Sequence, residues 1–149
     1  VMDGGRVAQT GSPLDIYNAP RTDFVATFLG DCNLIGVERS PTGGTRLAVA
    51  GGIDLPSDVN GAGASLVGIR PERFSIGSGA QPRDITLSGT VVETHFNGAD
   101  HDLVVDVGGR SIRARLANGG GAPPSAGSIA TLGCDFADLI PLQTVGVPR

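Results

Sequence analysis

The sequence has no lysine and no tryptophan, one tyrosine, two cysteines and no long hydrophobic run. Because no apolar stretch reaches the roughly 18 residues that a membrane-spanning helix needs, we predict no spanning helix. The 11 basic residues are all arginine, and with 15 acidic residues they give a net charge of −4. The charges are spread along the chain without a basic stripe, so we predict no nucleic-acid partner.

Sequence patterns of catalysis are missing as well. The chain contains no GxxxxGK[ST] phosphate loop, no GxSxG, no HExxH and no CxxC. We therefore predict that it is not an enzyme by itself, with no catalytic residues, no nucleotide-binding residues and no cofactor. The two cysteines, Cys32 and Cys134, are too few for the disulfide framework of a small secreted domain. Reduced thiols in a cytosolic protein are the preferred interpretation.

The 24 glycines and 10 prolines divide the chain into short pieces, which favours many short strands. A hairpin is predicted over residues 1–11, followed by helices at 12–17 and 22–29. The second helix carries an apolar stripe of Phe24, Val25, Phe28 and Leu29. Predicted strands cover residues 34–39, 45–50, 66–70, 88–94, 103–107, 111–116 and 129–134. The fold class is therefore mainly β, a closed or partly closed barrel of short antiparallel strands preceded by a hairpin and two short helices.

Two stretches of the predicted barrel look alike. AVAGGIDL (48–55) and VDVGGRSI (105–112) each place a glycine pair between apolar residues. Internal duplication of the barrel and chance similarity remain equally open. On the strand at 111–116, Arg113 and Arg115 alternate with apolar residues and are predicted to face solvent.

The strongest candidate for a metal site lies between residues 95 and 102. His95, Asp100, His101 and Asp102 are ligand types that bind divalent ions. The intervening Asn97-Gly98 pair marks a hairpin turn, where polar residues commonly face water. Because the spacing matches no known ligand pattern, we favour a solvated turn over a metal site.

A second candidate follows the apolar strand at 66–70. Arg70 ends this strand, and Pro71 and Glu72 come next. One interpretation is an anion site that uses Arg70 and Arg73. The other, which we favour, is a structural brace in which the guanidinium of Arg70 binds neighbouring acceptors.

A family resemblance is carried by two motifs. Residues 1–35, VMDGGRVAQTGSPLDIYNAPRTDFVATFLGDCNLI, resemble the segment that follows the switch-histidine strand in the ATPase subunits of ATP-binding cassette (ABC) importers, with Ser12 in place of Thr and Asp15 in place of Glu. The run GIRPE (Gly68, Ile69, Arg70, Pro71 and Glu72) then resembles the signature of the transport-associated OB (TOBE) domain that ends the same proteins. Residues 85–149 add a matching strand pattern without a sharp motif.

This resemblance implies a fragment of a longer subunit. Residues 1–30 would be the end of the nucleotide-binding domain with its linker helices, and residues 31–149 an OB-like TOBE regulatory domain. The missing nucleotide-binding domain would bind ATP and Mg²⁺. The implied partners are a second copy, the nucleotide-binding domain of the same chain and the membrane subunits. The implied location is cytoplasmic, peripheral to the inner membrane.

Three functions follow as alternatives. The first is a regulatory and dimerisation domain of an ABC importer; the run GDCNLI (30–35) resembles polyamine-type importers, with iron(III) and sugar importers close behind. The second is a barrel that senses a small anion or solute. The third, and least favoured, is a metal-binding protein that uses the 95–102 turn.

Overall fold

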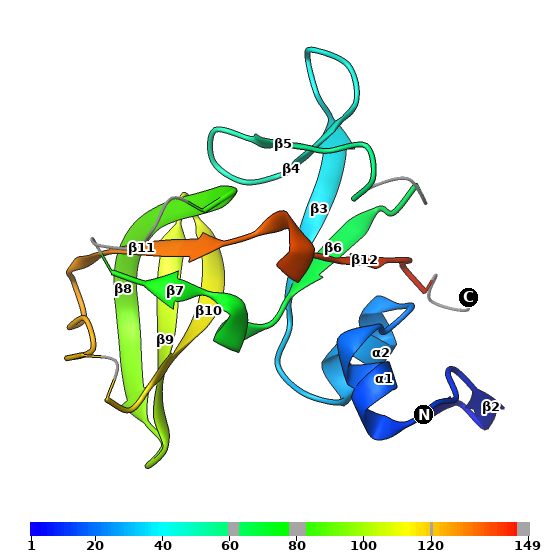
Figure 1. The fold of residues 1–149 in the computed structure, drawn as a ribbon, viewed down its shortest axis with the longest axis horizontal. Helices are drawn as coiled ribbons and strands as arrows, with labels where there is room; N and C mark the ends of the chain where they lie inside the picture. Colours follow the sequence, from blue (N-terminus) through cyan, green and yellow to red (C-terminus); the bar gives the residue numbers. More distant parts are fainter. Residues whose placement is uncertain (60–62, 78–82, 120, 146–149) are drawn as a thin grey trace. The chain divides into compact units, whose positions relative to one another are not determined.

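The computed structural model describes residues 1–59, 63–77, 83–119 and 121–145. The chain forms two compact units (Figure 1). Unit 1 contains Val1–Ala48, Asp54–Ile69 and Leu139–Arg149, and unit 2 contains Val49–Ile53 and Arg70–Asp138. Within the described ranges, no helix is long and apolar enough to cross a membrane. The mainly β, antiparallel fold class predicted from the sequence is confirmed.

Unit 1 begins with the predicted hairpin and helices. Strands β1 (Met2–Asp3) and β2 (Arg6–Val7) pair in the hairpin, and the helices are α1 (Pro13–Asn18) and α2 (Asp23–Phe28). The hydroxyl oxygen of Ser12 accepts a hydrogen bond from the backbone N–H of Asp15, which caps α1. Thr22 caps α2 in the same way through the N–H of Val25. These local capping residues explain why both helices start where the sequence predicts.

The apolar stripe predicted on α2 is only partly correct. The structure buries Val25 and Ala26 completely, whereas Phe28 is 59% exposed. The rings of Phe24 and Phe28 lie 5.7 Å apart and contact one another instead of entering the core. The helix has only six residues, so its buried face is set by the sheet it packs on rather than by a long helical period.

The sheet of unit 1 has the strand order β12-β6-β3-β4-β5. Its strands are β3 (Asn33–Arg39), β4 (Thr45–Leu47), β5 (Ile53–Leu55), β6 (Leu66–Ile69) and β12 (Ile140–Leu142). The core of this unit is aliphatic, and its fully buried side chains include Val25, Ile35, Leu47, Val67, Ile69 and Leu142.

The N-terminal segment is joined to this sheet beyond β12. Thr22 and Gln143 form a parallel bridge, in which the N–H of Gln143 donates to the carbonyl of Arg21 at 3.0 Å. The Oδ1 atom of Asp23 accepts a hydrogen bond from the N–H of Val145 at 3.2 Å. Strand β12 and the three residues after it therefore connect β6 to the start of α2.

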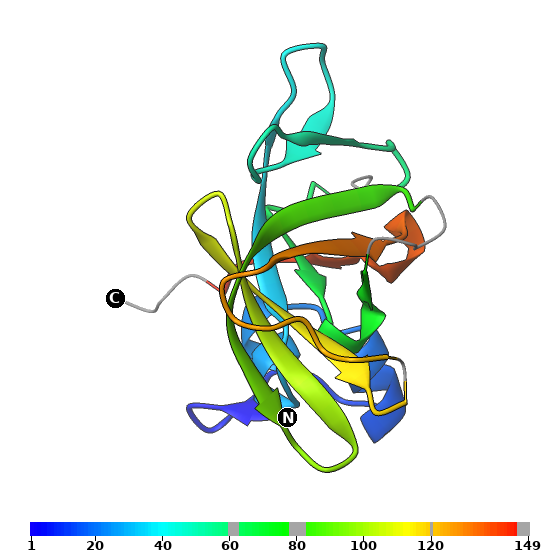
Figure 2. The ribbon, with the colours of Figure 1, turned by 90° about the vertical axis from the view of Figure 1, so that its left-hand side faces the viewer.

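The sheet of unit 2 has the strand order β10-β9-β8-β11-β7. Its strands are β7 (Ser75–Ile76), β8 (Ile85–Phe96), β9 (Asp100–Val107), β10 (Arg110–Ala117) and β11 (Ile129–Cys134). Figure 2 shows the long, curved β8 beside β9. A bulge between Val91 and Glu93 shifts the register of this pair, and such bulges bend and twist a strand. The inward side chains form the core: Ile85, Leu87, Val91, Leu103, Val105, Ile112 and Leu132.

Three strands were not predicted from the sequence. They are β5, β7 and β12, each of two or three residues. Such short segments show no alternation, and they become strands only because a distant segment pairs with them. The division into residues 1–30 and 31–149 stays a prediction.

Candidate functional site

The predicted GIRPE signature joins two elements. Gly68 and Ile69 end β6, and Pro71 starts the 3₁₀ turn η1 (Pro71–Arg73). A side chain at Gly68 would force its neighbours to shift, because a Cβ atom there would lie 2.8 Å from the Sγ of Cys32 and 3.1 Å from the Cδ1 of Leu142. Ile69 is fully buried. The first part of the signature is therefore explained by close packing.

The charged residues of the signature differ strongly in exposure. Arg70 is only 2% exposed, and its carbonyl accepts the hydrogen bond from the N–H of Arg73 that closes η1. Glu72 is exposed. A charged side chain that is buried to this extent is normally paired, which agrees with the brace interpretation of Arg70. The role of this residue stays a prediction.

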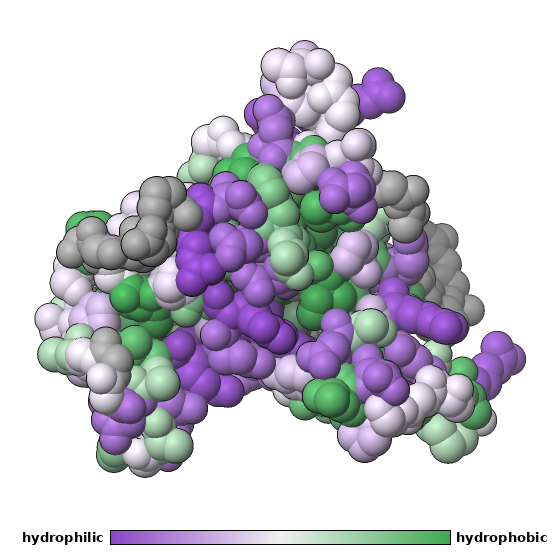
Figure 3. Space-filling model, in the orientation of Figure 1, coloured by the Kyte–Doolittle hydropathy of each residue, from purple (hydrophilic) through white to green (hydrophobic). Residues whose placement is uncertain are grey.

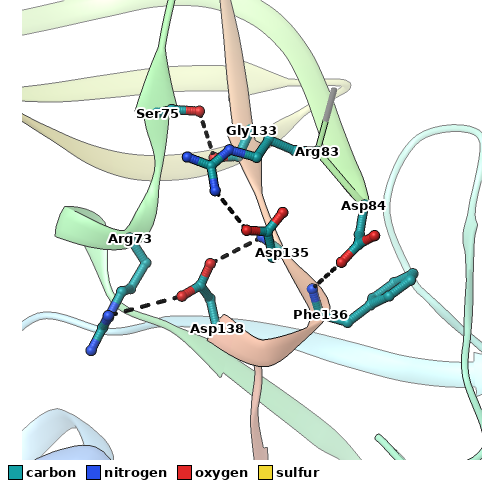
Figure 4. A network of polar contacts seen from close by, with 8 residues as sticks. All are labelled: Arg73, Ser75, Arg83, Asp84, Gly133, Asp135, Phe136 and Asp138. Atoms are coloured by element: carbon teal, nitrogen blue, oxygen red, sulfur yellow. Dashed lines mark hydrogen bonds and ion pairs between the residues drawn. The ribbon is translucent and has the colours of Figure 1, made fainter. Parts of the chain in front are cut away.

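A polar network surrounds a second 3₁₀ turn, η2 (Phe136–Asp138) (Figure 4). The Oδ2 atom of Asp138 accepts a hydrogen bond from the N–H of Asp135 at 3.0 Å, and the Oδ2 atom of Asp84 accepts one from the N–H of Phe136 at 3.0 Å. Two carboxylates thus bind the backbone donors at the start of the turn, as capping residues do.

Two arginines neutralise this acidic turn. Arg83 donates through Nη1 to the Oδ2 of Asp135 at 2.6 Å, and Nη1 of Arg73 lies 4.0 Å from the Oδ1 of Asp138. Beside them, the hydroxyl of Ser75 donates to the carbonyl of Gly133 at 3.1 Å, which holds β7 against β11 (Figure 4). The network fixes the chain where it leaves β11, and no catalytic arrangement is evident among these residues.

The thiol of Cys134 is buried next to this network. Burial raises its pKa to about 12, and the charges of Asp138 and Asp135 act in the same direction. Cys134 therefore stays protonated at neutral pH, and a protonated thiol is a poor nucleophile. Cys32 is half-buried, and its thiol donates a hydrogen bond to the carbonyl of Asn33 at 3.9 Å.

The candidate metal residues lie at the tip of the β8–β9 hairpin. His95 pairs with Asp102 across the two strands, while Phe96 pairs with His101. Neighbouring residues of a strand point to opposite faces, so the two imidazoles are on opposite sides of the hairpin. His95 Nε2 lies 2.6 Å from the Oε2 of Glu93, and the ring of His101 contacts that of Phe96.

The carboxylates of Asp100 and Asp102 both lie next to the guanidinium of Arg115. Arg115 Nε donates to the Oδ1 of Asp102 at 2.7 Å and lies 3.6 Å from Asp100. Asn97 donates to the other carboxylate oxygen of Asp102 at 2.6 Å. The described residues contain no group of three or more His, Cys, Asp or Glu side chains placed to hold a metal ion.

Arg115 is not simply solvated, which corrects the prediction for the Arg113/Arg115 face. Its hydrogen bond to Asp102 holds the pKa of that carboxyl below its usual range, although burial opposes the shift. Arg113 is exposed as predicted. The distinction depends on cross-strand register, because Arg115 lies opposite Asp102 whereas Arg113 lies opposite Val104.

Replacing Arg115 by alanine should lower the free energy of unfolding by about 0.5–1 kcal/mol, whereas Arg113→Ala should change it little. The depressed pKa of Asp102 means that this stabilisation is present at neutral pH and is lost as the pH falls through the folded-state pKa. Urea denaturation at pH 7 and in acid measures both effects. Equal midpoints for the two variants at pH 7 would contradict the assigned pairing.

Sequence reasoning missed the network at η2. The only available signal was the spacing of Asp135 and Asp138, three residues apart as in a capped turn. Asp84 and Arg83 lie about fifty positions earlier in the chain. Their part in the network depends on the pairing of β8 with β11.

Comparison with known proteins gives one family match and several relatives. The family model of the TOBE domain matches residues 67–142. The sulfate/thiosulfate import ATP-binding protein CysA 2 of Chromobacterium violaceum is 40% identical over 66% of this chain and 27% of that protein. The Fe(3+) ions import ATP-binding protein FbpC of Rhizobium etli is 32% identical over 72% of this chain and 31% of its own length.

A third relative is the sn-glycerol-3-phosphate import ATP-binding protein UgpC 2 of Rhizobium johnstonii, 36% identical over 72% of this chain and 31% of its length. The chain therefore spans about a third of the length of these curated relatives. Among solved structures, the cytoplasmic molybdate-binding protein ModG with molybdate bound matches with a TM-score of 0.55 and 13% identity. That match covers 79% of this chain and 96% of ModG, and it shows an OB-like fold.

Proposed function

The chain belongs to the TOBE domain family, and we propose that it is the regulatory and dimerisation domain of the ATP-binding subunit of an ABC importer. The observation that carries this proposal is the TOBE match over residues 67–142, in a chain whose relatives are named as import ATP-binding proteins. The relatives extend over about three times the matched length. We propose that ATP and Mg²⁺ bind in a further domain, not to the residues of this chain.

The proposed partners follow from the same role. They are a second copy of the chain, the nucleotide-binding domain and the membrane subunits, and the proposed location is the cytoplasmic side of the membrane complex. The relatives are named for sulfate/thiosulfate, iron(III) and sn-glycerol-3-phosphate. We extend the candidate cargo from polyamines to small solutes of these kinds.

Self-association is supported by exposed apolar side chains. In unit 2, Val92 is 50%, Phe96 62% and Ile129 72% exposed. On the face shown in Figure 3, hydrophobic residues form small separate groups among hydrophilic ones. Dispersed groups of this kind favour a modest contact rather than an extensive obligate one.

The second candidate, an anion-sensing barrel, is favoured by one observation. The matching solved structure is named as a molybdate-binding protein. This chain has arginines at 70 and 73 around its first 3₁₀ turn, although Arg73 already lies near Asp138. This pairing makes Arg73 less available to an anion, so we favour the regulatory role.

Sedimentation velocity and thermal shift distinguish the two candidates. A regulatory and dimerisation domain should show a concentration-dependent monomer–dimer equilibrium and no change in melting temperature with molybdate, sulfate or phosphate. An anion sensor should melt at a higher temperature as the anion concentration rises. A strictly monomeric protein at high concentration would contradict the dimerisation role. In the proposed full-length subunit, deletion of residues 31–149 should leave ATP hydrolysis intact and reduce dimerisation.

A further inference from the structure

The sequence contains three Asn-Gly pairs, at 60–61, 97–98 and 118–119, and the first lies outside the described residues. Such a pair is chemically reactive, because glycine has no side chain to shield its backbone nitrogen. The nitrogen of the glycine attacks the Cγ of the asparagine, a C–N bond forms, and the side-chain nitrogen leaves as ammonia. Water then opens the resulting succinimide ring and gives aspartate or isoaspartate. The net reaction consumes one water and replaces an amide by a carboxylate.

The two described pairs differ in how the asparagine side chain is held. Asn97 lies at the end of β8, where its Nδ2 donates to the Oδ2 of Asp102 at 2.6 Å and lies 3.4 Å from the Oδ1 of Asp100. Carboxylate oxygens only accept hydrogen bonds, so they fix the orientation of this amide. Asn118 is exposed, and within the described ranges its side chain makes no hydrogen bond. Its backbone N–H donates to the carbonyl of Ala99 at 3.0 Å, so both asparagines lie at the same end of the sheet.

The two carboxylates beside Asn97 are themselves held in place. Arg115 Nε donates to the Oδ1 of Asp102 at 2.7 Å and lies 3.6 Å from the Oδ2 of Asp100. We call these three charged residues the clamp. Hydrogen bonds to a charged acceptor are roughly twice as strong as neutral ones. Cyclisation must break the bonds between Asn97 and the clamp, because its Cγ moves to the backbone nitrogen of Gly98 and its Nδ2 departs.

The product of the reaction would turn an attractive contact into a repulsive one. A carboxylate at position 97 only accepts hydrogen bonds, and it would face the Oδ2 of Asp102, to which the amide now donates. Like charges this close to one another repel. Arg115 would then face three carboxylates instead of two. The isoaspartate product also adds one carbon to the main chain, at a turn closed by the bond from the N–H of Asn97 to the carbonyl of Asp100.

We propose that Asn97–Gly98 is a site of spontaneous deamidation, that the clamp keeps Asn97 in its amide form, and that conversion to a carboxylate loosens the tip of the β8–β9 hairpin (residues 95–102). The same charged side chains that slow the reaction make its product unfavourable in the folded hairpin. The site does not depend on the proposed function, since it rests on contacts within unit 2.

The rate of deamidation tests the clamp. The full chain is incubated in mildly alkaline buffer, and peptide mapping by mass spectrometry follows the conversion of Asn97 and Asn118 separately. In urea, where the fold is lost, both should convert at similar rates. In native buffer, Asn97 should be slowed relative to its rate in urea about three- to ten-fold more than Asn118 is. Asp102→Ala should remove most of this protection at Asn97 and leave the rate at Asn118 unchanged.

Two controls separate the clamp from other effects. Asn118 is the internal control, because local unfolding at this end of the sheet would expose both asparagines. Glu93→Ala is the matched variant, since it removes a nearby carboxylate that contacts His95 instead, and it should leave both rates unchanged. Equal protection of the two asparagines, no acceleration of Asn97 by Asp102→Ala, or equal acceleration of both would overturn the proposal.

Hydrogen exchange in variants that mimic the product tests the loosening of the tip. Asn97→Asp should raise the exchange rate of the tip amides about five-fold. Asn97→Ala removes the attraction without adding a charge and should raise it less. Asp102→Asn, added to Asn97→Asp, restores an amide donor opposite the carboxylate and should recover part of the protection, while Asn118→Asp should leave the tip unchanged. Equal exchange in Asn97→Asp and Asn97→Ala, or no recovery in the double variant, would show that repulsion does not loosen the tip.

Discussion

Replacing Gly89 by alanine is expected to destabilise the protein by about 3 kcal/mol, at the upper end of the usual cost of overpacking. A Cβ atom at this position would lie 2.3 Å from the carbonyl oxygen of Asp106 and 2.8 Å from Cγ1 of Val105. The obstructing oxygen belongs to the backbone of β9, which is paired on both sides, so that a shift of this strand would disturb its pairing with β8 and β10. Gly89 thus permits β8 to bend closely over β9.

Gly36→Ala is the matched control, since it also adds one methyl group to a strand glycine. A Cβ atom at Gly36 would meet the Cβ of Ala48 at an ordinary 3.6 Å. Urea denaturation followed by far-UV circular dichroism compares the two variants. The midpoint should fall strongly for Gly89→Ala and stay close to that of the parent for Gly36→Ala. A similar midpoint for both variants would mean that β8 relaxes easily at this point.

The features predicted correctly from the sequence are those set by local chemistry. Ser12 and Thr22 each lie three residues before the residue whose N–H group they bind, so the caps are local in sequence and both helices could be located. Long strands such as β9 and β10 alternate apolar and polar residues, which reports their two faces. The GIRPE resemblance led to the family because it is a contiguous run, and the burial of Arg70 agrees with its place at the end of an apolar strand.

The features that were missed depend on which distant segments of the chain pair with one another in the sheets. The contact of Asp84 with the N–H of Phe136 requires β8 to pair with β11. The short strands β7 and β12 were missed for the same reason, because each forms only where it pairs with a strand that is distant in the sequence, β11 and β6 respectively.

Ending the chain at Asp138 is expected to unfold the sheet of unit 1 while the sheet of unit 2 persists. This truncation removes β12, with the buried side chains of Leu139 and Leu142. Loss of a buried leucine side chain typically costs about 2–5 kcal/mol. The loss of two, together with the pairing to β6, is comparable to the whole stability of a domain, about 5–15 kcal/mol.

The same truncation removes the anchor of the N-terminal segment, because residues 143–145 bind the backbone and side chain of residues 21–23. Unit 2 keeps all five strands of its sheet, since its fifth strand is β7 and not β12. Hydrogen exchange should therefore become fast in β3, β6 and α2 and stay slow in β8, β9 and β11. A chain that ends at Val145 retains β12 and these contacts, and should behave like the parent. Slow exchange in β6 after truncation at Asp138 would show that the sheet of unit 1 is stable without β12.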